Sequence, residues 1–424
     1  MNLTRRHACE PVVVTGIGVV SPNGVGCEAF TNALLAGRSG LSRPTFEGPF
    51  AERLKLRTSS VGAVCDFDPS AVMDETELRR VPRLIPMALA ASREAIAMAR
   101  LPIELLDDQR RTAVVLGTGG GGLAFVEQQY QLMFAENGRA SLFSITAGTH
   151  GNLSSELSIQ LGLRGPSHVV STGCTSSTDA LGYARLLIRS GQADRVVVGG
   201  ADSPIAPGIL SAFEKMQVVS TRRWDDPRQS SRPFDVERDG FVLGEGAWMF
   251  VLESAESSHG RSATILAELA GYGSTCDAYH RVRIAPDAAE SARAIQLALA
   301  DADATPAQLD YANLHGTSTD MNDRLETVAL KAALGETVAR SLPMSSTKSM
   351  IGHPQGACGA AGVAATILCG RRGHVHPTAN LTDPGDGCDL DYVPGAVRER
   401  RVSVALCNCI AFGSKNSAIV LRLP

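Results

Sequence analysis

The strongest constraint on the fold is an alternation of short apolar runs and helical patterns along nearly the whole chain. Apolar runs of strand length recur between segments in which apolar residues have helical spacing. Such alternation predicts α/β structure with mixed sheets. A chain of 424 residues also exceeds what one simple core supports, so we expect two core units or one large composite unit.

The predicted elements divide into two halves. In the first half, strands are predicted at residues 11–20, 112–118, 167–172, 195–200 and 247–252, and helices at 88–100, 154–161 and 178–190. In the second half, strands are predicted at 263–272, 310–314, 341–346, 401–407 and 418–423, and helices at 288–302, 323–334 and 357–369. The sequence itself contains no visible repeat.

Cys174 stands where a strand is predicted to end and a helix to begin. A thiol at a helix N-terminus faces unpaired backbone N–H groups and the positive end of the helix dipole, which favour the reactive thiolate. The alternative is a buried structural cysteine, because free Cys is among the most buried residue types. The strand-Gly-Cys-helix turn favours a nucleophile.

Two further segments supply groups that a thiolate nucleophile needs. His315 follows an apolar stretch and is close in sequence to the hydroxyls of Thr317 and Thr319, and Lys348 and His353 follow a second apolar stretch. Each segment is predicted to be a short strand that ends in a loop. A single His on a loop usually has no chemical role, but one Cys with two such His residues indicates a nucleophilic site.

Composition and charge exclude several classes of protein. The chain is 44% hydrophobic and 20% charged, as in a globular protein with an ample core, and its net charge of -4 argues against a nucleic-acid binder. Residues 1–10 lack the apolar segment of a signal peptide, and no run of 18 apolar residues predicts a membrane span. We expect a cytoplasmic protein with reduced thiols.

Neither a nucleotide site nor a metal site is predicted. The glycines at 119–122 follow a strand but lack the Lys-Ser/Thr of a P-loop and the spacing of a dinucleotide-binding motif. Cys407 with Cys409, and His374 with His376, are more typical of neighbours on one strand than of zinc ligands. We expect no metal.

Together, these segments resemble the elongating β-ketoacyl-ACP synthases, and the order and separation of the motifs agree from about residue 11 to residue 422. The resemblance implies an α/β thiolase fold, a pseudo-duplicated five-layer α/β/α/β/α sandwich. It also implies an N-terminal half at 11–260 that carries the nucleophile and a C-terminal half at 261–424 that carries two catalytic His. The motifs are Val170-Ser-Thr-Gly-Cys-Thr-Ser-Ser, His315-Gly-Thr-Ser-Thr, Lys348-Ser-Met-Ile-Gly-His, Arg232-Pro-Phe-Asp, Asp239-Gly-Phe-Val-Leu-Gly-Glu-Gly and the glycine-containing loop near Phe412.

The family's reaction assigns a role to each of these groups. Cys174 would accept the acyl chain from an acyl carrier protein, and the backbone amides of Cys174 and Phe412 would form the oxyanion hole. His315 and His353 would stabilise the enolate left when malonyl-ACP loses carbon dioxide, and Lys348 is the fourth predicted catalytic residue. No separate cofactor is expected, because the substrates arrive on the phosphopantetheine arm of the carrier.

The chain departs from the family beside Lys348. The resemblance implies a Glu nine residues after His353 as the partner of this Lys, but Gly362 stands there. A buried ammonium needs a partner. Asp323 and Glu326 match an acidic pair in the family and could neutralise Lys348 instead; as ordinary first-turn acids of a helix they would have no such role.

A second departure concerns the expected gate of the acyl pocket. Ile410 stands where fatty acid enzymes have a Phe, and Ala411, Ser414 and Lys415 replace Gly, Gly and Thr. Because Ala and Ser restrict the backbone where Gly does not, we expect a retuned or stiffer gate. Ile410, Thr317 and Thr319 are our predicted substrate-binding residues.

With these departures, the chain most resembles the ketosynthase-alpha subunit of type II polyketide synthases. Such subunits pair with a homologous chain-length factor that lacks the Cys, so a heterodimer is expected, or otherwise a homodimer, with residues 125–134 at the interface. Acyl carrier proteins are acidic, and Arg79, Arg80 and Arg83 are the predicted docking residues, with a solvated helix face as the alternative.

Three other functions stay open at this point. One is a housekeeping fatty acid elongating synthase, which shares the His315 motif. Another is a non-catalytic chain-length or scaffold subunit, which Cys174 disfavours. The third is a thiolase-type enzyme that uses coenzyme A, for which Cys407 or Cys409 would be the second reactive thiol.

Overall fold

The computed structural model describes residues 10–424. Most of residues 1–10, for which the sequence predicts no targeting signal, therefore lies outside the described residues. Within residues 10–424, no helix has the length and apolar character needed to cross a membrane.

Strands and helices follow one another along both predicted halves, whose boundary stays a prediction. The first half contains β1 (Val12–Ser21), β2 (Gly24–Val25), α1 (Cys27–Leu35), α2 (Pro49–Leu54), α3 (Glu75–Leu78), α4 (Leu84–Ala99), α5 (Leu106–Arg111), β3 (Thr112–Gly117), α6 (Leu123–Phe134), α7 (Ser144–Gly148), α8 (Leu153–Leu161), β4 (Ser167–Val170), α9 (Ser176–Arg189), β5 (Arg195–Asp202), α10 (Pro207–Lys215), β6 (Gly246–Ser254) and α11 (Ala255–Gly260). The second half contains β7 (Ala267–Cys276), α12 (Ala289–Asp301), β8 (Tyr311–Asn313), α13 (Asp320–Leu334), α14 (Glu336–Ser341), β9 (Met344–Ser345), α15 (Lys348–Ile351), α16 (Cys358–Gly370), β10 (His374–Val375), β11 (Arg398–Glu399), β12 (Val404–Ala411) and β13 (Lys415–Arg422). The predicted division at residues 260 and 261 falls between α11 and β7.

The sheet reveals a duplication that the sequence hides. Its strand order is β4-β3-β5-β6-β1 in the first half and, from the opposite edge, β9-β8-β12-β13-β7 in the second. Strand β1 pairs antiparallel with β6, as β7 does with β13. Strand β6 also pairs antiparallel with β5, as β13 does with β12. The remaining pairs in the two orders are parallel: β3 with β4 and β5, and β8 with β9 and β12. The halves join where β1 and β7 pair antiparallel at two positions.

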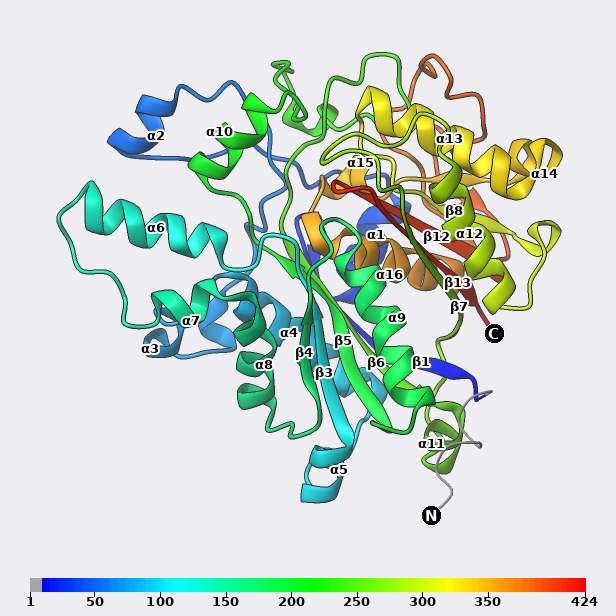
Figure 1. The fold of residues 1–424 in the computed structure, drawn as a ribbon, viewed down its shortest axis with the longest axis horizontal. Helices are drawn as coiled ribbons and strands as arrows, with labels where there is room; N and C mark the ends of the chain where they lie inside the picture. The colour runs from blue at the N-terminus through cyan, green and yellow to red at the C-terminus, as the bar shows by residue number, and fades with distance from the viewer. Residues whose placement is uncertain (1–9) are drawn as a thin grey trace.

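Helices α9 and α16 lie between the two halves of the sheet, and both contact strands of both halves (Figure 1). On the outer faces, α4 and α8 cover the first half, while α12, with α13 beside it, covers the second. One buried cluster joins residues of both half-sheets to α9 and α16. The layers are therefore α/β/α/β/α, and the thiolase-type sandwich is confirmed.

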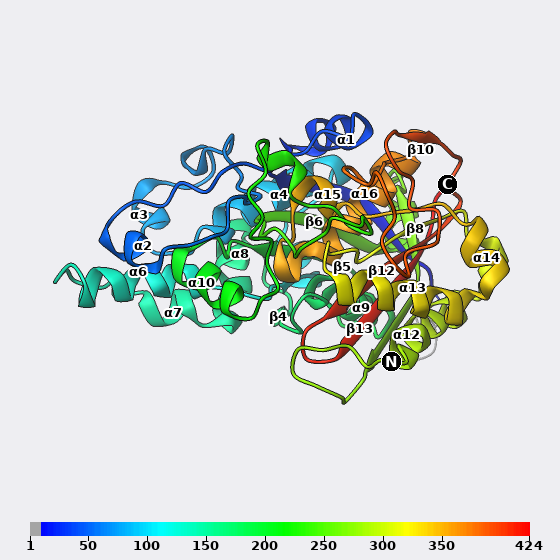
Figure 2. The same ribbon diagram turned by 90° about the horizontal axis from the view of Figure 1, so that it is seen from above.

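Local sequence explains these layers. Helix α16 is apolar on almost every side, as a helix between two sheets must be. In β1, Gly16 and Gly18 let α4 approach closely, because a Cβ at either position would lie within about 2 Å of a backbone oxygen of α4. Helices α6 and α7 instead lie at one end of the molecule, opposite α14 (Figure 2).

Some predicted boundaries are wrong. The strand predicted at 341–346 is only Met344–Ser345, because helix α14 extends to Ser341. Lys348 begins the short helix α15 instead of lying in a loop after a strand. Strand β12 extends to Ala411, so the loop predicted after residue 407 is mostly strand, with a tight turn to β13.

Candidate active site

The Cys174 turn is built by its neighbours. Gly173 has φ of 74°, a conformation that glycine adopts without strain, and the chain then enters α9 at Ser176. The hydroxyl of Ser176 donates to the carbonyl of Gly173 at 2.6 Å and accepts from the amide of Thr172 at 2.9 Å. Cys174 is 7% exposed and lines a cavity of about 460 Å³. The turn directs the thiol into this cavity.

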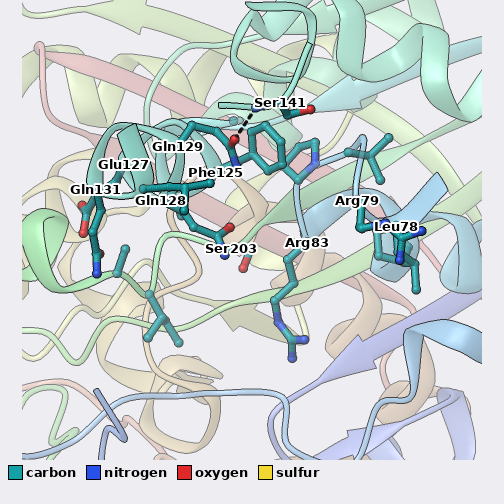
Figure 3. A pocket seen from close by; sticks show the side chains of 18 of the residues that line it. Leu78, Arg79, Arg83, Phe125, Glu127, Gln128, Gln129, Gln131, Ser141 and Ser203 are labelled. Atoms are coloured by element: carbon teal, nitrogen blue, oxygen red, sulfur yellow. Dashed lines mark hydrogen bonds between the residues drawn. The ribbon is translucent and has the colours of Figure 1, made fainter. Parts of the chain in front are cut away.

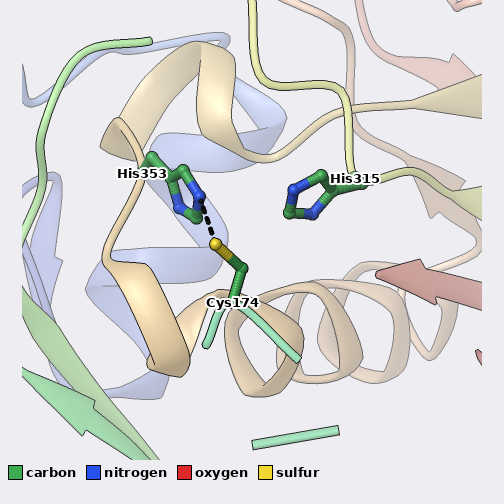
Figure 4. A group of neighbouring side chains, drawn as sticks. All are labelled: Cys174, His315 and His353. Carbon is green, nitrogen blue, oxygen red and sulfur yellow. Dashed lines mark hydrogen bonds between the residues drawn. The ribbon is translucent and has the colours of Figure 1, made fainter. Parts of the chain in front are cut away.

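His353 lies directly beside the nucleophile, with its Nε2 atom 3.2 Å from Sγ of Cys174 (Figure 4). The backbone of His353 is fixed on both sides, because its amide donates to Val242 and its carbonyl accepts from Gly244. Burial opposes a charge on the ring, but the negative charges of Cys174 and Cys358 outweigh burial and raise the pKa of His353 to about 9. His353 therefore lies within hydrogen-bonding distance of the thiol and can accept its proton.

His315 faces the same sulfur from another loop (Figure 4), and its ring centre is 5.4 Å from that of His353. Burial, with the charge of Lys348, lowers the pKa of His315 to about 3. His315 is therefore neutral at physiological pH. The surroundings therefore shift the pKa values of the two His residues in opposite directions.

Two buried carboxylates hold the His315 loop. Glu326 accepts hydrogen bonds from the amides of His315 and Gly316, each at 2.7 Å, and Asp323 accepts one from Thr317 at 2.9 Å. Burial raises the pKa of both carboxyls, to about 6 for Asp323. These acids position the loop.

Lys348 contacts His315 instead of an acid. Its Nζ donates to the carbonyl of His315 at 2.6 Å and lies 3.3 Å from Nδ1 of the ring. Within residues 10–424, no ion pair joins Lys348 to Asp323 or Glu326, so the neutralisation considered from sequence is not found. Because an ammonium only donates, Nδ1 of His315 accepts and the proton resides on Nε2.

The missing Glu has a steric explanation. A Cβ at Gly362 would lie 2.5 Å from the side-chain oxygen of Asn313. Asn313 is held there by a hydrogen bond to Thr347 at 2.9 Å. A longer side chain at position 362 would displace this amide.

The predicted substrate-binding residues line the same cavity as Cys174. Thr317, Thr319, Ile410 and Phe412 all contribute to its wall, and the carbonyl oxygen of Phe412 comes within 3.4 Å of a Cβ placed at Gly173. The turn between β12 and β13 thus lies against the nucleophile turn. The oxyanion role of the Cys174 and Phe412 amides stays a prediction.

The predicted docking residues lie elsewhere. Arg79 and Arg83 line a separate cavity of about 870 Å³ that Phe125 and Gln129 of α6 also line (Figure 3). Arg83 pairs with the buried Glu245 at 3.1 Å, and Arg80 pairs with Glu77 at 2.5 Å. None of the three lines the Cys174 cavity, so their docking role stays a prediction.

Sequence reasoning missed several groups near Cys174. Arg238 and Arg283 line its cavity, and the ring of Phe241 lies edge-on to His353 at 5.2 Å. The thiols of Cys358 and Cys409 lie behind Cys174. From the sequence, Cys409 is a candidate only as the second thiol of a thiolase-type enzyme, and Phe241 lies in one of the motifs. Cys358 shares with Cys174 only its place at a helix start.

The types of side chain gathered here also occur in metal sites. The ligand atoms of Cys174, His315 and His353 lie within 4.8 Å of one another, as do those of His315, Cys358 and Cys409. The remaining sequence candidates are separate: Cys407 contacts Thr366, and His376 is buried beside Tyr311. A nucleophile with two polar rings also suits acyl transfer, which needs no metal.

Comparison with known proteins gives agreement along the whole chain. The family models for the Beta-ketoacyl synthase N-terminal and C-terminal domains match residues 9–258 and 266–382. The tetracenomycin polyketide synthase ketoacyl synthase alpha subunit of Streptomyces glaucescens is 39% identical, with 99% of this chain and 98% of that protein covered. The 3-oxoacyl-[acyl-carrier-protein] synthase 2 of Synechocystis sp. is 38% identical, with 97% of each covered.

Solved structures agree as well. A type II polyketide synthase acyl carrier protein in complex with its ketosynthase bound to the hexaketide superposes with a TM-score of 0.89 at 32% identity, covering 98% of this chain and 99% of that one. The ishigamide ketosynthase/chain length factor superposes with a TM-score of 0.87, also at 32% identity and with the same coverage. With its Cys174, His315 and His353 constellation in this fold, the chain belongs to the beta-ketoacyl synthase family and is a condensing acyltransferase.

Proposed function

We propose that the chain is the catalytic ketosynthase of a type II polyketide system. It joins an enzyme-bound acyl chain to malonyl-ACP with loss of carbon dioxide and gives β-ketoacyl-ACP. The observation that carries the proposal is the 3.2 Å contact of Cys174 with His353, with neutral His315 facing the same sulfur. A non-catalytic chain-length subunit has no use for this arrangement.

The first step loads the acyl chain. His353 takes the proton of Cys174, and the sulfur attacks the thioester carbon of an acyl carrier protein. The amides of Cys174 and Phe412 stabilise the oxyanion. The C–S bond to the carrier then breaks, the carrier leaves as a thiol by taking the proton, and the acyl chain is bound to Cys174.

Acylation changes the charge of the site. The Cys174 negative charge is the largest influence that raises the pKa of His353, and a thioester carries no such charge. Burial then favours a neutral ring. The pKa of His353 falls when the Cys174 charge is removed, and both rings can donate through an N–H.

The second step forms the carbon–carbon bond. Malonyl-ACP loses carbon dioxide, and the electron pair of the broken C–C bond passes to an enolate whose oxygen accepts from His315 and His353. Lys348 supports this step, because its contact with Nδ1 keeps the proton of His315 on Nε2. The enolate carbon attacks the acyl carbon, and Cys174 leaves as a thiolate.

The proposed partners are an acyl carrier protein, whose phosphopantetheine arm presents both substrates, and a homologous chain-length factor. Helices α6 and α7 carry an exposed apolar face that includes Tyr130, Phe134 and Ile145. Such a face on a globular protein is typical of an interaction surface. It lies beside the cavity of Arg79 and Arg83, and Arg283 adds a positive charge where the Cys174 cavity opens.

Reconstitution tests the function. Purified chain would be incubated with acyl-ACP and malonyl-ACP, with and without a coexpressed homologue that lacks the Cys, and the products separated by mass spectrometry. We expect repeated condensation that needs the homologue, and none with Cys174→Ala. Single-cycle elongation by the chain alone, at the full rate and with a fatty acid carrier protein, would instead identify a fatty acid enzyme.

A further inference from the structure

Two thiols behind the nucleophile have no part in the proposed reaction. Cys358 is the first residue of α16, and Cys409 lies in β12. Their Sγ atoms are 3.6 Å apart, and both side chains are buried. They come from segments 51 residues apart in the chain, so only the tertiary fold brings them together.

The thiol pair contacts the catalytic groups directly. Sγ of Cys358 and Sγ of Cys409 lie 3.3 and 3.2 Å from the carbonyl oxygen of Cys174, and each can donate to it while it is a protonated thiol. Cys409 also lies 3.5 Å from Nδ1 of His315. A chemical change at the pair therefore reaches both the nucleophile turn and one catalytic ring.

The surroundings shift the pKa values of the two thiols in opposite directions. Burial opposes ionisation of Cys358, but its hydrogen bond to Cys409 and the positive charges of Lys348 and His353 lower its pKa well below the usual value. Burial raises the pKa of Cys409. A thiolate beside a protonated thiol is the arrangement from which an oxidised sulfur is readily resolved into a disulfide.

We propose that Cys358 and Cys409 form a redox modification site, at which a peroxide converts the pair into a disulfide. The Cys358 thiolate attacks one oxygen of the peroxide, the O–O bond breaks, and sulfenic acid and hydroxide form. Sγ of Cys409 then attacks the sulfenic sulfur, and its proton leaves with the hydroxyl as water. The hydroxide takes a proton from solvent, which replaces the one that Cys358 lost on ionisation. In total the pair loses two electrons and two protons, and the peroxide is reduced to two waters.

The disulfide changes the active site. An S–S bond of about 2.05 Å requires the sulfurs, now 3.6 Å apart, to approach each other, so both side chains must leave their present positions. A disulfide has no S–H group, so the hydrogen bond from Cys409 to the Cys174 carbonyl and the contact of Cys409 with His315 are lost. Resting on the proposed function, the inference predicts that oxidation inhibits decarboxylation reversibly, without modification of Cys174.

The first experiment maps the disulfide independently of activity. The Cys174→Gln variant, which lacks the reactive thiol, is treated with hydrogen peroxide, alkylated and digested. We expect one cross-linked peptide pair, Cys358 to Cys409, lighter by two hydrogens and restored by dithiothreitol. Cys407, two residues away on the same strand and bound to Thr366, is the internal control and stays free. Free thiols at 358 and 409, or sulfinic acid there, would overturn the proposal.

The second experiment measures the consequence. We expect decarboxylation of malonyl-ACP by Cys174→Gln to fall about tenfold on oxidation and to return on reduction, since small displacements of catalytic groups cost this much or more. In Cys174→Gln with Cys358→Ala, which removes the sulfur that reacts with peroxide first, peroxide should leave the rate unchanged from that of the same variant before oxidation. In Cys174→Gln with Cys409→Ala, dithiothreitol should release no cross-linked peptide. Equal inhibition in the Cys358→Ala double variant would place the oxidation elsewhere and refute the assignment.

These experiments distinguish a failure of the proposed function from a failure of the proposed modification site. If unoxidised Cys174→Gln does not decarboxylate malonyl-ACP, the proposed function is wrong, while the peptide map still decides the disulfide. If decarboxylation occurs and no disulfide forms, the function stands and the modification site is refuted.

Discussion

The two halves of the molecule share one sheet order but place different chemistry at corresponding points. In the first half, Cys174 immediately precedes α9 and lines the cavity beside His353. In the second half, Cys358 begins α16, yet its sulfur faces Cys409 and the Cys174 carbonyl. A cysteine at a helix start becomes a nucleophile only where the turn before it directs the sulfur to the substrate. The second half instead provides His315, His353 and Lys348.

The largest expected effect separates the two cysteines. Cys174→Ala should reduce condensation by about 10³-fold or more, because no other group holds the acyl chain. Cys358→Ala is the matched control, since it removes the corresponding thiol of the second half, and it should retain most of the activity. Steady-state assays with both carrier-bound substrates measure this. Similar losses in both variants would mean that the halves are not functionally distinct.

The next effect tests what the second half contributes. His315→Ala and His353→Ala should each reduce malonyl-ACP decarboxylation by about 10²-fold or more, as loss of a donor to a developing oxyanion does. Single-turnover self-acylation of Cys174 should fall less. If acylation falls further than decarboxylation in either variant, that His residue serves the nucleophile rather than the enolate.

A smaller effect concerns the gate. Ile410 is buried in the cavity wall, and the larger ring in Ile410→Phe should reduce elongation of long or conjugated acyl chains by about tenfold while sparing short ones. Ile410→Val is the control that keeps the branched shape. Chain-length profiles with defined acyl-ACP substrates and the partner subunit give the answer. Unchanged elongation of long chains would mean that the pocket floor or the partner subunit sets the chain-length selectivity.

The smallest effect is on stability. Because the pKa of His353 is about 9 in the folded state and about 6.5 when unfolded, its contribution is fully present below pH 6.5 and is lost as pH rises through 9. Denaturant titrations should show the free energy of unfolding falling across this window. Cys174→Ala, which lacks the charge that raises this pKa, should show a weaker fall; an equal slope in both proteins would argue against the Cys174–His353 pair.

Local patterns predicted more of the fold than of the site's surroundings. Buried apolar runs such as β1 and β6, and the spacing in α9, follow from sequence alone. The duplication could not be predicted this way, because it resides in strand pairing and not in residue identity. The strand at 341–346 was overpredicted because α14 occupies its start.

Within the site, too, some features follow from local sequence and others depend on tertiary packing. Cys174, His315 and His353 lie in motifs that can be recognised along the chain. The contact between Cys358 and Cys409 depends on how α16 packs against β12, and the contact of Lys348 with the His315 carbonyl depends on how two loops meet. No local pattern encodes either.

The most direct test of the central claim is the position of the acyl group after loading. The enzyme would be incubated with acyl-ACP alone, quenched in acid, and its peptides mapped by mass spectrometry. We predict one acyl adduct per chain, on Cys174, unchanged in Cys358→Ala and absent in Cys174→Ala. An adduct on Cys358 or Cys409 of the unmodified enzyme would contradict the account, because the second half would then provide the nucleophile.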